Sequence, residues 1–241
     1  MPPHHPKLLH ALQEASGKWP LKPQIDEAID AIGASGHPVV RLVLNDIYDV
    51  GAEFFRWEMA TAVAGSIMGI NPFDQPNVQA AKDMTESVLA QFESSGQLPA
   101  MEDPAYIGKL LGMARPGDYL VIMAYVLQTP EVDLALDNLR RRVTERYGIA
   151  TTMGYGPRFL HSTGQLHKGG PGTGLFLQIT GEHIQDLEIP GAPFTFGVLA
   201  DAQALGDLQA LRSSDRRAVR VDVGSTPEQG IRKMAEELGS P

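Results

Sequence analysis

The stretch of residues 154–174 combines many glycines with polar side chains that could bind an anion or a polyhydroxyl ligand. Its glycines are Gly154, Gly156, Gly164, Gly169, Gly170, Gly172 and Gly174. Because the stretch has no helical or strand period, it predicts a long loop between two strands, and such loops in α/β domains are usually functional. The candidate substrate-binding residues are His161, Ser162, Thr163, Gln165, His167, Lys168 and Gly170. The alternative is a structural loop that packs on its own aromatic and leucine side chains.

A second candidate is Lys82, in a predicted helix over residues 77–92. Val78, Lys82, Thr85 and Leu89 follow the spacing i, i+4, i+7, i+11, which places them on one stripe of the helix. A lysine in an otherwise apolar stripe is unfavourable unless its ammonium reaches a partner or a ligand. We therefore expect Lys82 to point into a polar pocket, the alternative being a lysine that extends to solvent from the border of the stripe.

Several other chemistries do not fit the spacing of these residues. The glycines Gly164 and Gly169 have the first spacing of a phosphate-binding loop, but the lysine and hydroxyl residue that must follow are missing. No dinucleotide fingerprint is complete either. His161 and His167 are six residues apart with no carboxylate beside them, which is a poor zinc spacing, so no metal is predicted. Ser162 lacks the glycines of a nucleophile elbow.

The composition limits the class of protein further. The 241 residues include no cysteine, which excludes disulfides, thiolate zinc sites and a cysteine nucleophile. The 20 Lys and Arg against 29 Asp and Glu give a net charge of −9, which argues against a nucleic-acid partner. The longest apolar run, residues 119–127, is too short to span a bilayer, and the amino end lacks the order of a signal peptide. These features predict a cytoplasmic protein with no membrane partner.

The remaining elements are predicted from hydrophobic period and turn residues. In the N-terminal part we expect short helices over 8–15 and 24–32, a strand over 38–44, and a helix over 51–69 that is apolar almost all round and therefore buried on most sides. In the C-terminal part we expect strands over 119–126, 150–153, 175–180 and 218–223 and helices over 131–147, 195–212 and 227–238. Arg212, Arg216, Arg217 and Arg220 are expected to form a solvated surface patch.

This order of elements predicts an α/β protein. A helical N-terminal part with one strand, residues 1–96, precedes a three-layer α/β sandwich with a mainly parallel sheet, residues 97–241. The boundary is placed at the segment Ser94-Ser-Gly-Gln-Leu-Pro, which has the composition of a linker.

The segment Phe73-Asp-Gln-Pro-Asn-Val-Gln-Ala-Ala-Lys82 resembles the carboxyl-terminal signature of glucose-6-phosphate isomerases. The residues that fit the signature are Gly65, Ile67, Met68, Phe73, Asp74, Gln75, Val78, Gln79 and Lys82. Asn77 departs from the Gly or Ala that is usual there. The pair Trp57-Glu58 is similar to an aromatic-Glu pair that precedes the signature. Segments around 53–58, 156–171 and 195–207 are most similar to the bifunctional transaldolase/glucose-6-phosphate isomerase branch of the family.

The resemblance implies interconversion of glucose 6-phosphate and fructose 6-phosphate through an enediol, with no metal or organic cofactor. Lys82 falls on the family's active-site lysine, which is implicated in substrate binding and ring opening. In the family the catalytic base and the loop that holds the phosphate lie far upstream, whereas here only 72 residues precede Phe73. The chain is therefore similar to the carboxyl-terminal portion of such an enzyme, and we expect it to be inactive alone.

Three hypotheses follow for the whole chain. In the first, it contributes to isomerisation of a sugar phosphate together with an upstream isomerase/transaldolase portion or a partner chain. In the second, it is a non-catalytic module that binds a sugar phosphate or regulates a partner. In the third, it forms a homo-oligomer through the apolar helix 51–69. Glu58 is the only carboxylate proposed as a base, and an ion pair with Arg56 or Arg41 is the favoured role for it.

Overall fold

The structure is a computed structural model that describes residues 9–14, 23–74, 76–99 and 106–239, with the backbone alone for residues 9–14, 23–24 and 161–162. The chain divides into two compact units, residues 1–74 and residues 75–241. The sequence placed a boundary near residue 96 instead. The division falls earlier because helix α3 (Pro76–Ser95) packs along α7 (Phe196–Ser213) and α6 (Arg158–Gly169) of the second unit.

The first unit contains β1 (Leu9–Glu14), α1 (Pro23–Ala34), β2 (Val39–Leu44) and α2 (Asp49–Met68). The short helix predicted over residues 8–15 is wrong, because this segment is extended and pairs in parallel with β2. Pairing across the strands satisfies backbone groups of both segments, and such tertiary context overrides a weak local helix preference. Arg41 on β2 joins Asp26 and Asp30 of α1 at 2.8 and 2.6 Å.

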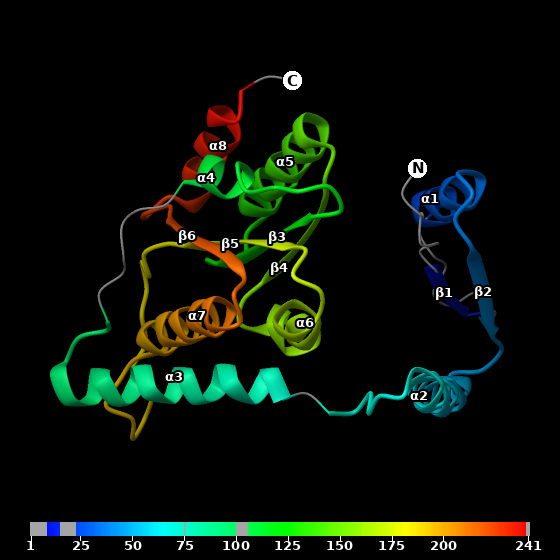
Figure 1. The fold of residues 1–241 in the computed structure, drawn as a ribbon, viewed down its shortest axis with the longest axis horizontal. Helices are drawn as coiled ribbons and strands as arrows, with labels where there is room; N and C mark the ends of the chain where they lie inside the picture. Colours follow the sequence, from blue (N-terminus) through cyan, green and yellow to red (C-terminus); the bar gives the residue numbers. More distant parts are fainter. Residues whose placement is uncertain (1–8, 15–22, 75, 100–105, 240–241) are drawn as a thin grey trace. The chain divides into compact units, whose positions relative to one another are not determined.

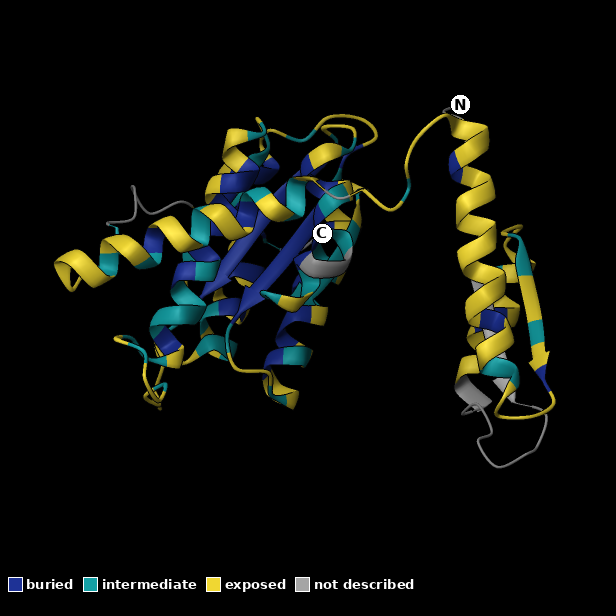
Figure 2. Ribbon diagram, turned by 90° about the horizontal axis from the view of Figure 1, so that it is seen from below, coloured by how far each residue is buried: buried dark blue, intermediate teal, exposed yellow. Residues whose placement is uncertain are grey.

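Helix α2 is exposed along almost its whole length within this unit (Figure 2). Its only buried residues are Glu53 and Gly65. Phe55 and Ile67 are 70% and 82% exposed, so the expectation of a helix buried on most sides is wrong for this unit. The physical reason is that a helix without a polar face needs apolar surface on several sides. The described part of the unit supplies only α1 and the strand pair.

The second unit is a three-layer α/β sandwich, which confirms the predicted fold class (Figure 1). Its strands are β3 (Tyr119–Tyr125), β4 (Ala150–Tyr155), β5 (Gly174–Thr180) and β6 (Arg217–Asp222), in the order β4-β3-β5-β6, all parallel. One face is covered by α4 (Ile107–Leu111), α5 (Pro130–Tyr147) and α8 (Pro227–Glu237), and the other by α6 and α7. Helix α3 forms a further layer on α6 and α7.

Successive side chains of β3 point to opposite faces of the sheet, because side-chain direction alternates along a strand. Leu120 and Ile122 belong to the core beneath α5 and α8. Val121 and Met123 belong to the core beneath α6 and α7. All four side chains are fully buried, which explains the continuous apolar run in the sequence.

The long loop expected over residues 154–174 is wrong, since most of it is helix α6 and the ends of β4 and β5. Its glycines mark close packing of elements. A Cβ at Gly154 would overlap the ring of Phe159, and a Cβ at Gly156 would overlap the ring of Tyr125. Gly164 faces Val78 of α3 at ordinary contact distance. The glycine density is therefore a signature of helix packing and does not mark an irregular ligand loop.

Arg216, Arg217 and Arg220 donate hydrogen bonds to other elements of the unit, which corrects the expectation of a solvated patch for these three. Arg212 is exposed, as expected. Arg217 donates to both carboxylate oxygens of Asp118 at 2.6 and 2.9 Å, and these hydrogen bonds hold the pKa of Asp118 below its usual value. Arg217 also donates to the backbone oxygens of Met113 and Gly172. The start of the last strand is thereby fixed to the segments before β3 and β5.

Candidate functional site

A cavity of about 210 Å³ lies between α3, α6 and α7 in the second unit. Its polar lining comes from all three helices, and its apolar lining comes from α3 and from the start of α6. The lining residues are Val78, Ala81, Lys82, Thr85, Glu86, Pro157, Leu160, Lys168, Gln203 and Asp207. Two of the residues predicted from the sequence, Lys82 and Lys168, thus line the same cavity.

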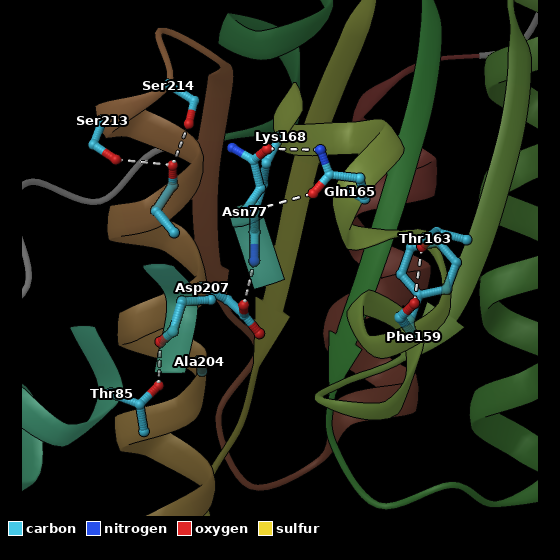
Figure 3. A network of polar contacts seen from close by, with 12 residues as sticks. Asn77, Thr85, Phe159, Thr163, Gln165, Lys168, Ala204, Asp207, Ser213 and Ser214 are labelled. Atoms are coloured by element: carbon cyan, nitrogen blue, oxygen red, sulfur yellow. Dashed lines mark hydrogen bonds and ion pairs between the residues drawn. The ribbon is translucent and has the colours of Figure 1, made fainter. Parts of the chain in front are cut away.

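Lys168 and Asp207 form a buried ion pair at the wall of this cavity (Figure 3). The Lys168 ammonium lies 3.0 Å from Asp207 Oδ1, and the two side chains are only 2% and 9% exposed. Tyr125 on β3 donates from its hydroxyl to Asp207 Oδ2 at 2.5 Å. Burial, and secondly the negative charge of Asp207, raise the pKa of Tyr125 well above its usual value, so the phenol keeps its proton and remains a donor.

The end of α6 that carries Lys168 is held by the segment before β6. Arg216 donates from its Nη2 to the backbone oxygens of Lys168 and Gly170, at 2.6 and 2.8 Å. The last carbonyls of a helix have no intrahelical partner, and a cation there also favours the helix dipole. The backbone of Lys168 is therefore fixed independently of its side chain.

Helix α3 supplies the opposite wall. Thr85 donates its hydroxyl proton to the backbone oxygen of Ala81 at 2.9 Å, which leaves its oxygen lone pairs as acceptors. Lys82 and Glu86 are exposed at the rim of the cavity, and neither forms an ion pair with another described residue. Lys82 therefore lines the cavity, although it is not enclosed by the protein.

Close approach of α3 and α7 sets the width of the cavity. At Gly206 an added Cβ would lie 2.8 Å from the backbone nitrogen of Thr85. Such contacts require glycine, because any larger residue pushes the two helices apart. Gln203 and Asp207, on the flanks of Gly206, are thereby brought up to Thr85.

The other predicted binding residues have structural partners outside the cavity. Gln165 donates to the side chain of Asn77 at 2.8 Å and accepts from the Asn77 backbone nitrogen at 3.1 Å (Figure 3). These two bonds join α6 to the start of α3. Thr163 donates to the backbone oxygen of Phe159 within α6, at 2.8 Å. Gly170 follows α6 and accepts from Arg216.

His167 is buried on the sheet side of α6, where its ring packs against Phe159 and Phe176. Its Nδ1 lies 2.9 Å from the hydroxyl of Tyr119, and its Nε2 has no partner among the described residues. Burial, and secondly the charge of Lys168, lower its pKa to about 4, so the ring is neutral near pH 7. For His161 and Ser162 the structure gives only the backbone, within α6.

Sequence reasoning missed the cavity residues Thr85, Glu86, Gln203 and Asp207 as a group. Glu86 was open to detection, because it follows Lys82 at the i+4 spacing of helical neighbours. Asp207 gave a weaker signal, a carboxylate on a helix of mostly apolar residues.

No group of three or more His, Cys, Asp or Glu suited to a metal occurs in the part of the chain that the structure describes. None of the described helices combines the length and apolar character needed to cross a membrane.

The fold and the cavity define a three-layer parallel α/β unit with a small polar site between its outer helices. No model of a known protein family matches the chain. A stretch of 59 residues, 24% of this chain, is 36% identical to glucose-6-phosphate isomerase from Lactiplantibacillus plantarum and covers 13% of that protein. The chain thus matches only a small part of that relative's length. The match supports a distant relationship with glucose-6-phosphate isomerases.

Among solved structures, the chain is similar to a hypothetical protein from Thermus thermophilus. The TM-score is 0.45 and the sequence identity 18%, with 91% of this chain and 55% of that chain covered.

Proposed function

We propose that this chain is the carboxyl-terminal portion of a glucose-6-phosphate isomerase and that its cavity contacts the sugar phosphate. The observation that carries the proposal is the convergence of Lys82 and Lys168 on one cavity, although they belong to different helices. Lys82 also lies in the segment that resembles the isomerase signature, and the partial match to a glucose-6-phosphate isomerase is consistent with this origin.

The reaction would be the aldose–ketose isomerisation of glucose 6-phosphate and fructose 6-phosphate. Lys82, at the rim, would bind the substrate and assist ring opening. Such a reaction also needs a base within hydrogen-bond reach of C1 and C2. Glu58 lacks the burial that would raise its pKa for this role, because it is exposed on α2. Arg56 pairs with Glu53, and Arg41 with α1, so the ion pair expected for Glu58 is wrong as well.

The missing base and phosphate clamp would come from an upstream isomerase portion or from a partner chain. The segments that resemble the transaldolase/isomerase branch make a fused upstream portion of that kind part of the proposal. The same proposal implies a cytoplasmic enzyme whose ligand is a sugar phosphate, with no nucleic-acid partner.

Binding of fructose 6-phosphate to the full chain tests this proposal, with the melting temperature and titration calorimetry as readouts. We expect Lys82→Met to weaken binding by about tenfold or more, since a charge-assisted hydrogen bond contributes roughly 1.5–3 kcal/mol. The matched control is Lys233→Met, which removes an exposed lysine from α8 on the other face of the sheet. Equal binding by wild type and Lys82→Met would contradict the role of Lys82.

A coupled assay that converts fructose 6-phosphate to glucose 6-phosphate tests whether this chain catalyses the reaction alone or only binds the substrate. The isolated chain should bind the substrate without useful turnover, because this chain supplies neither an identified base nor a phosphate clamp. Turnover of about 1–10³ s⁻¹, the usual range of enzymes, would show that the catalytic parts lie within this chain.

One observation favours a second candidate function, an oligomerisation module. Five apolar side chains of α2 are more than half exposed: Phe54, Phe55, Met59, Ile67 and Met68. In this reading α2 joins copies of the chain, and the cavity of the second unit is a by-product of helix packing. Absence of fructose 6-phosphate binding together with self-association would favour this candidate.

A further inference from the structure

The ionisable side chains that line the cavity carry opposite formal charges in equal number. Lys82 and Lys168 are basic, and Glu86 and Asp207 are acidic. Asp207 neutralises Lys168 directly at 3.0 Å, and Glu86 follows Lys82 by one helical turn. Phosphate dianions are bound where protein groups bring excess positive charge, such as arginine clusters or the amino ends of helices. The side chains of this cavity bring no such excess.

The buried ion pair nevertheless keeps hydrogen-bonding capacity toward the cavity. The Lys168 ammonium has three N–H donors, and among the described residues Asp207 is its only acceptor. Each Asp207 oxygen accepts one bond, from Lys168 or from Tyr125, and retains further lone-pair capacity. Unfilled donors on a buried charge are unfavourable, so a ligand that fills them gains free energy.

The unfilled donors and acceptors lie beside each other, which is what a hydroxyl group matches, because it donates one bond and accepts others. The Thr85 oxygen adds an acceptor and the Gln203 amide adds both kinds of group. Val78, Pro157 and Leu160 provide apolar contacts for C–H groups. The volume of about 210 Å³ is below the roughly 300–1,000 Å³ of drug-sized ligand pockets, which suits a small polyol.

We propose that this cavity is a polyol subsite, which binds the uncharged hydroxyl-bearing carbons of the sugar and leaves the phosphate to groups outside the cavity. The inference rests on the proposed function and specifies which part of the ligand this chain recognises. Lys168, Asp207 and Gln203 contact the hydroxyls, and Tyr125 is a positioning residue that acts through Asp207.

Titration of the full chain with fructose 6-phosphate, fructose and inorganic phosphate tests the subsite. Fructose should bind within about tenfold of fructose 6-phosphate, since removing a phosphate that projects from the cavity costs little. Inorganic phosphate should not compete. Raising the salt from about 50 to about 200 mM should change the Kd of fructose by less than about twofold, because no net charge is neutralised.

Two variants change the charge of the cavity in a defined direction. Glu86→Gln leaves one excess positive charge at an exposed rim position, so the fold is retained. This variant should lower the Kd of fructose 6-phosphate by about threefold to tenfold at low salt and leave the Kd of fructose unchanged. The control is Glu93→Gln, at an exposed position two turns further along α3 and outside the cavity lining. It should change the Kd of neither ligand. Asp207→Asn should abolish fructose binding where the variant folds.

The outcomes separate this inference from the proposed function. Binding of fructose 6-phosphate and inorganic phosphate, with no binding of fructose at about a hundred times the Kd of the phosphorylated sugar, overturns the polyol subsite and leaves the proposed function standing. An equal effect of Glu86→Gln on fructose and fructose 6-phosphate overturns the subsite too. Absence of binding by both sugars overturns the inference and the proposed function together.

Discussion

A single histidine, His167, makes the stability of the second unit depend on pH. Its pKa falls from 6.5 in the unfolded chain to about 4 in the folded protein, chiefly because the ring is buried. Between these values the unfolded chain binds a proton that the folded protein does not, so stability decreases as the pH falls from about 6.5 toward 4. By linkage the loss reaches about 3 kcal/mol below pH 4.

We predict that His167→Phe removes this part of the acid sensitivity. Phenylalanine fits among Phe159, Phe176 and Tyr119 as an apolar ring of similar size, and the lost bond to Tyr119 costs about 1 kcal/mol at neutral pH. Urea unfolding at about pH 7, 5 and 4 for both proteins measures the effect, since the contributions of all other groups cancel in the difference. Parallel losses of stability in the two proteins would contradict the assignment to His167.

At the scale of elements, the cavity depends on how closely α3 approaches α7. We predict that Gly206→Ala destabilises the second unit by about 1–3 kcal/mol, because its Cβ would meet the backbone of Thr85 and neither backbone can move freely. Gly164→Ala is the control, since its Cβ would meet Val78 and Leu160 at an ordinary 3.8 Å. This control should be neutral or stabilising by up to about 1 kcal/mol through helix propensity. Thermal unfolding should therefore show a lower melting temperature for Gly206→Ala and an unchanged or higher one for Gly164→Ala.

The sequence predicted the strands more securely than helix α6, which carries Lys168. The apolar runs that became β3 and β5 have the length of buried strands, and both strands lie where they were expected. Helix α6 was missed because its glycines are loop formers when judged singly. In the structure Leu160, Gly164 and Lys168 form one buried face at i, i+4, i+8, so the glycine belongs to a helical period.

The same contrast holds for the candidate site. Lys82 and Lys168 were predicted because each is a basic residue in an unusual local setting. Asp207 could not be predicted as their neighbour, because its pairing with Lys168 depends on the register of α6 against α7. That register is a property of tertiary packing, which no local spacing in the sequence records. His167 shows the converse, since the sequence suggested a ligand contact and the structure gives it aromatic partners.

At the scale of the whole molecule, the two units differ in how much core they possess. The second unit has continuous apolar cores on both faces of its sheet, whereas the buried apolar side chains of the first unit are Ile29 and Leu44 among the residues described there. A two-stranded sheet with one or two helices rarely folds stably by itself. The second unit therefore has enough apolar core to fold as an independent domain. The first unit exposes apolar side chains of α2 that a partner would bury.

We predict that residues 75–241 alone unfold cooperatively and remain monomeric, whereas the full chain self-associates with rising concentration. Phe54→Lys combined with Ile67→Lys should reduce the association, because it places charges among exposed apolar groups of α2. Glu27→Lys on the exposed face of α1 controls for the change in net charge. Light scattering of the four proteins across concentrations measures the effect, and a full chain that stays monomeric throughout would contradict it.

The tie between Arg216 and the end of α6 also bears on how the protein is made. Ribosomes deliver the chain from its amino end, so Lys168 emerges well before Arg216. Until Arg216 arrives, the last carbonyls of α6 lack this donor, and Lys168 lacks Asp207 until α7 has been synthesised. Both contacts that fix Lys168 are therefore present together only after the chain has been synthesised through residue 216. A nascent chain stalled before residue 207 would have α6 without the ion pair to Asp207 and without the Arg216 hydrogen bonds, so this helix would lack the contacts that fix its end in the folded unit.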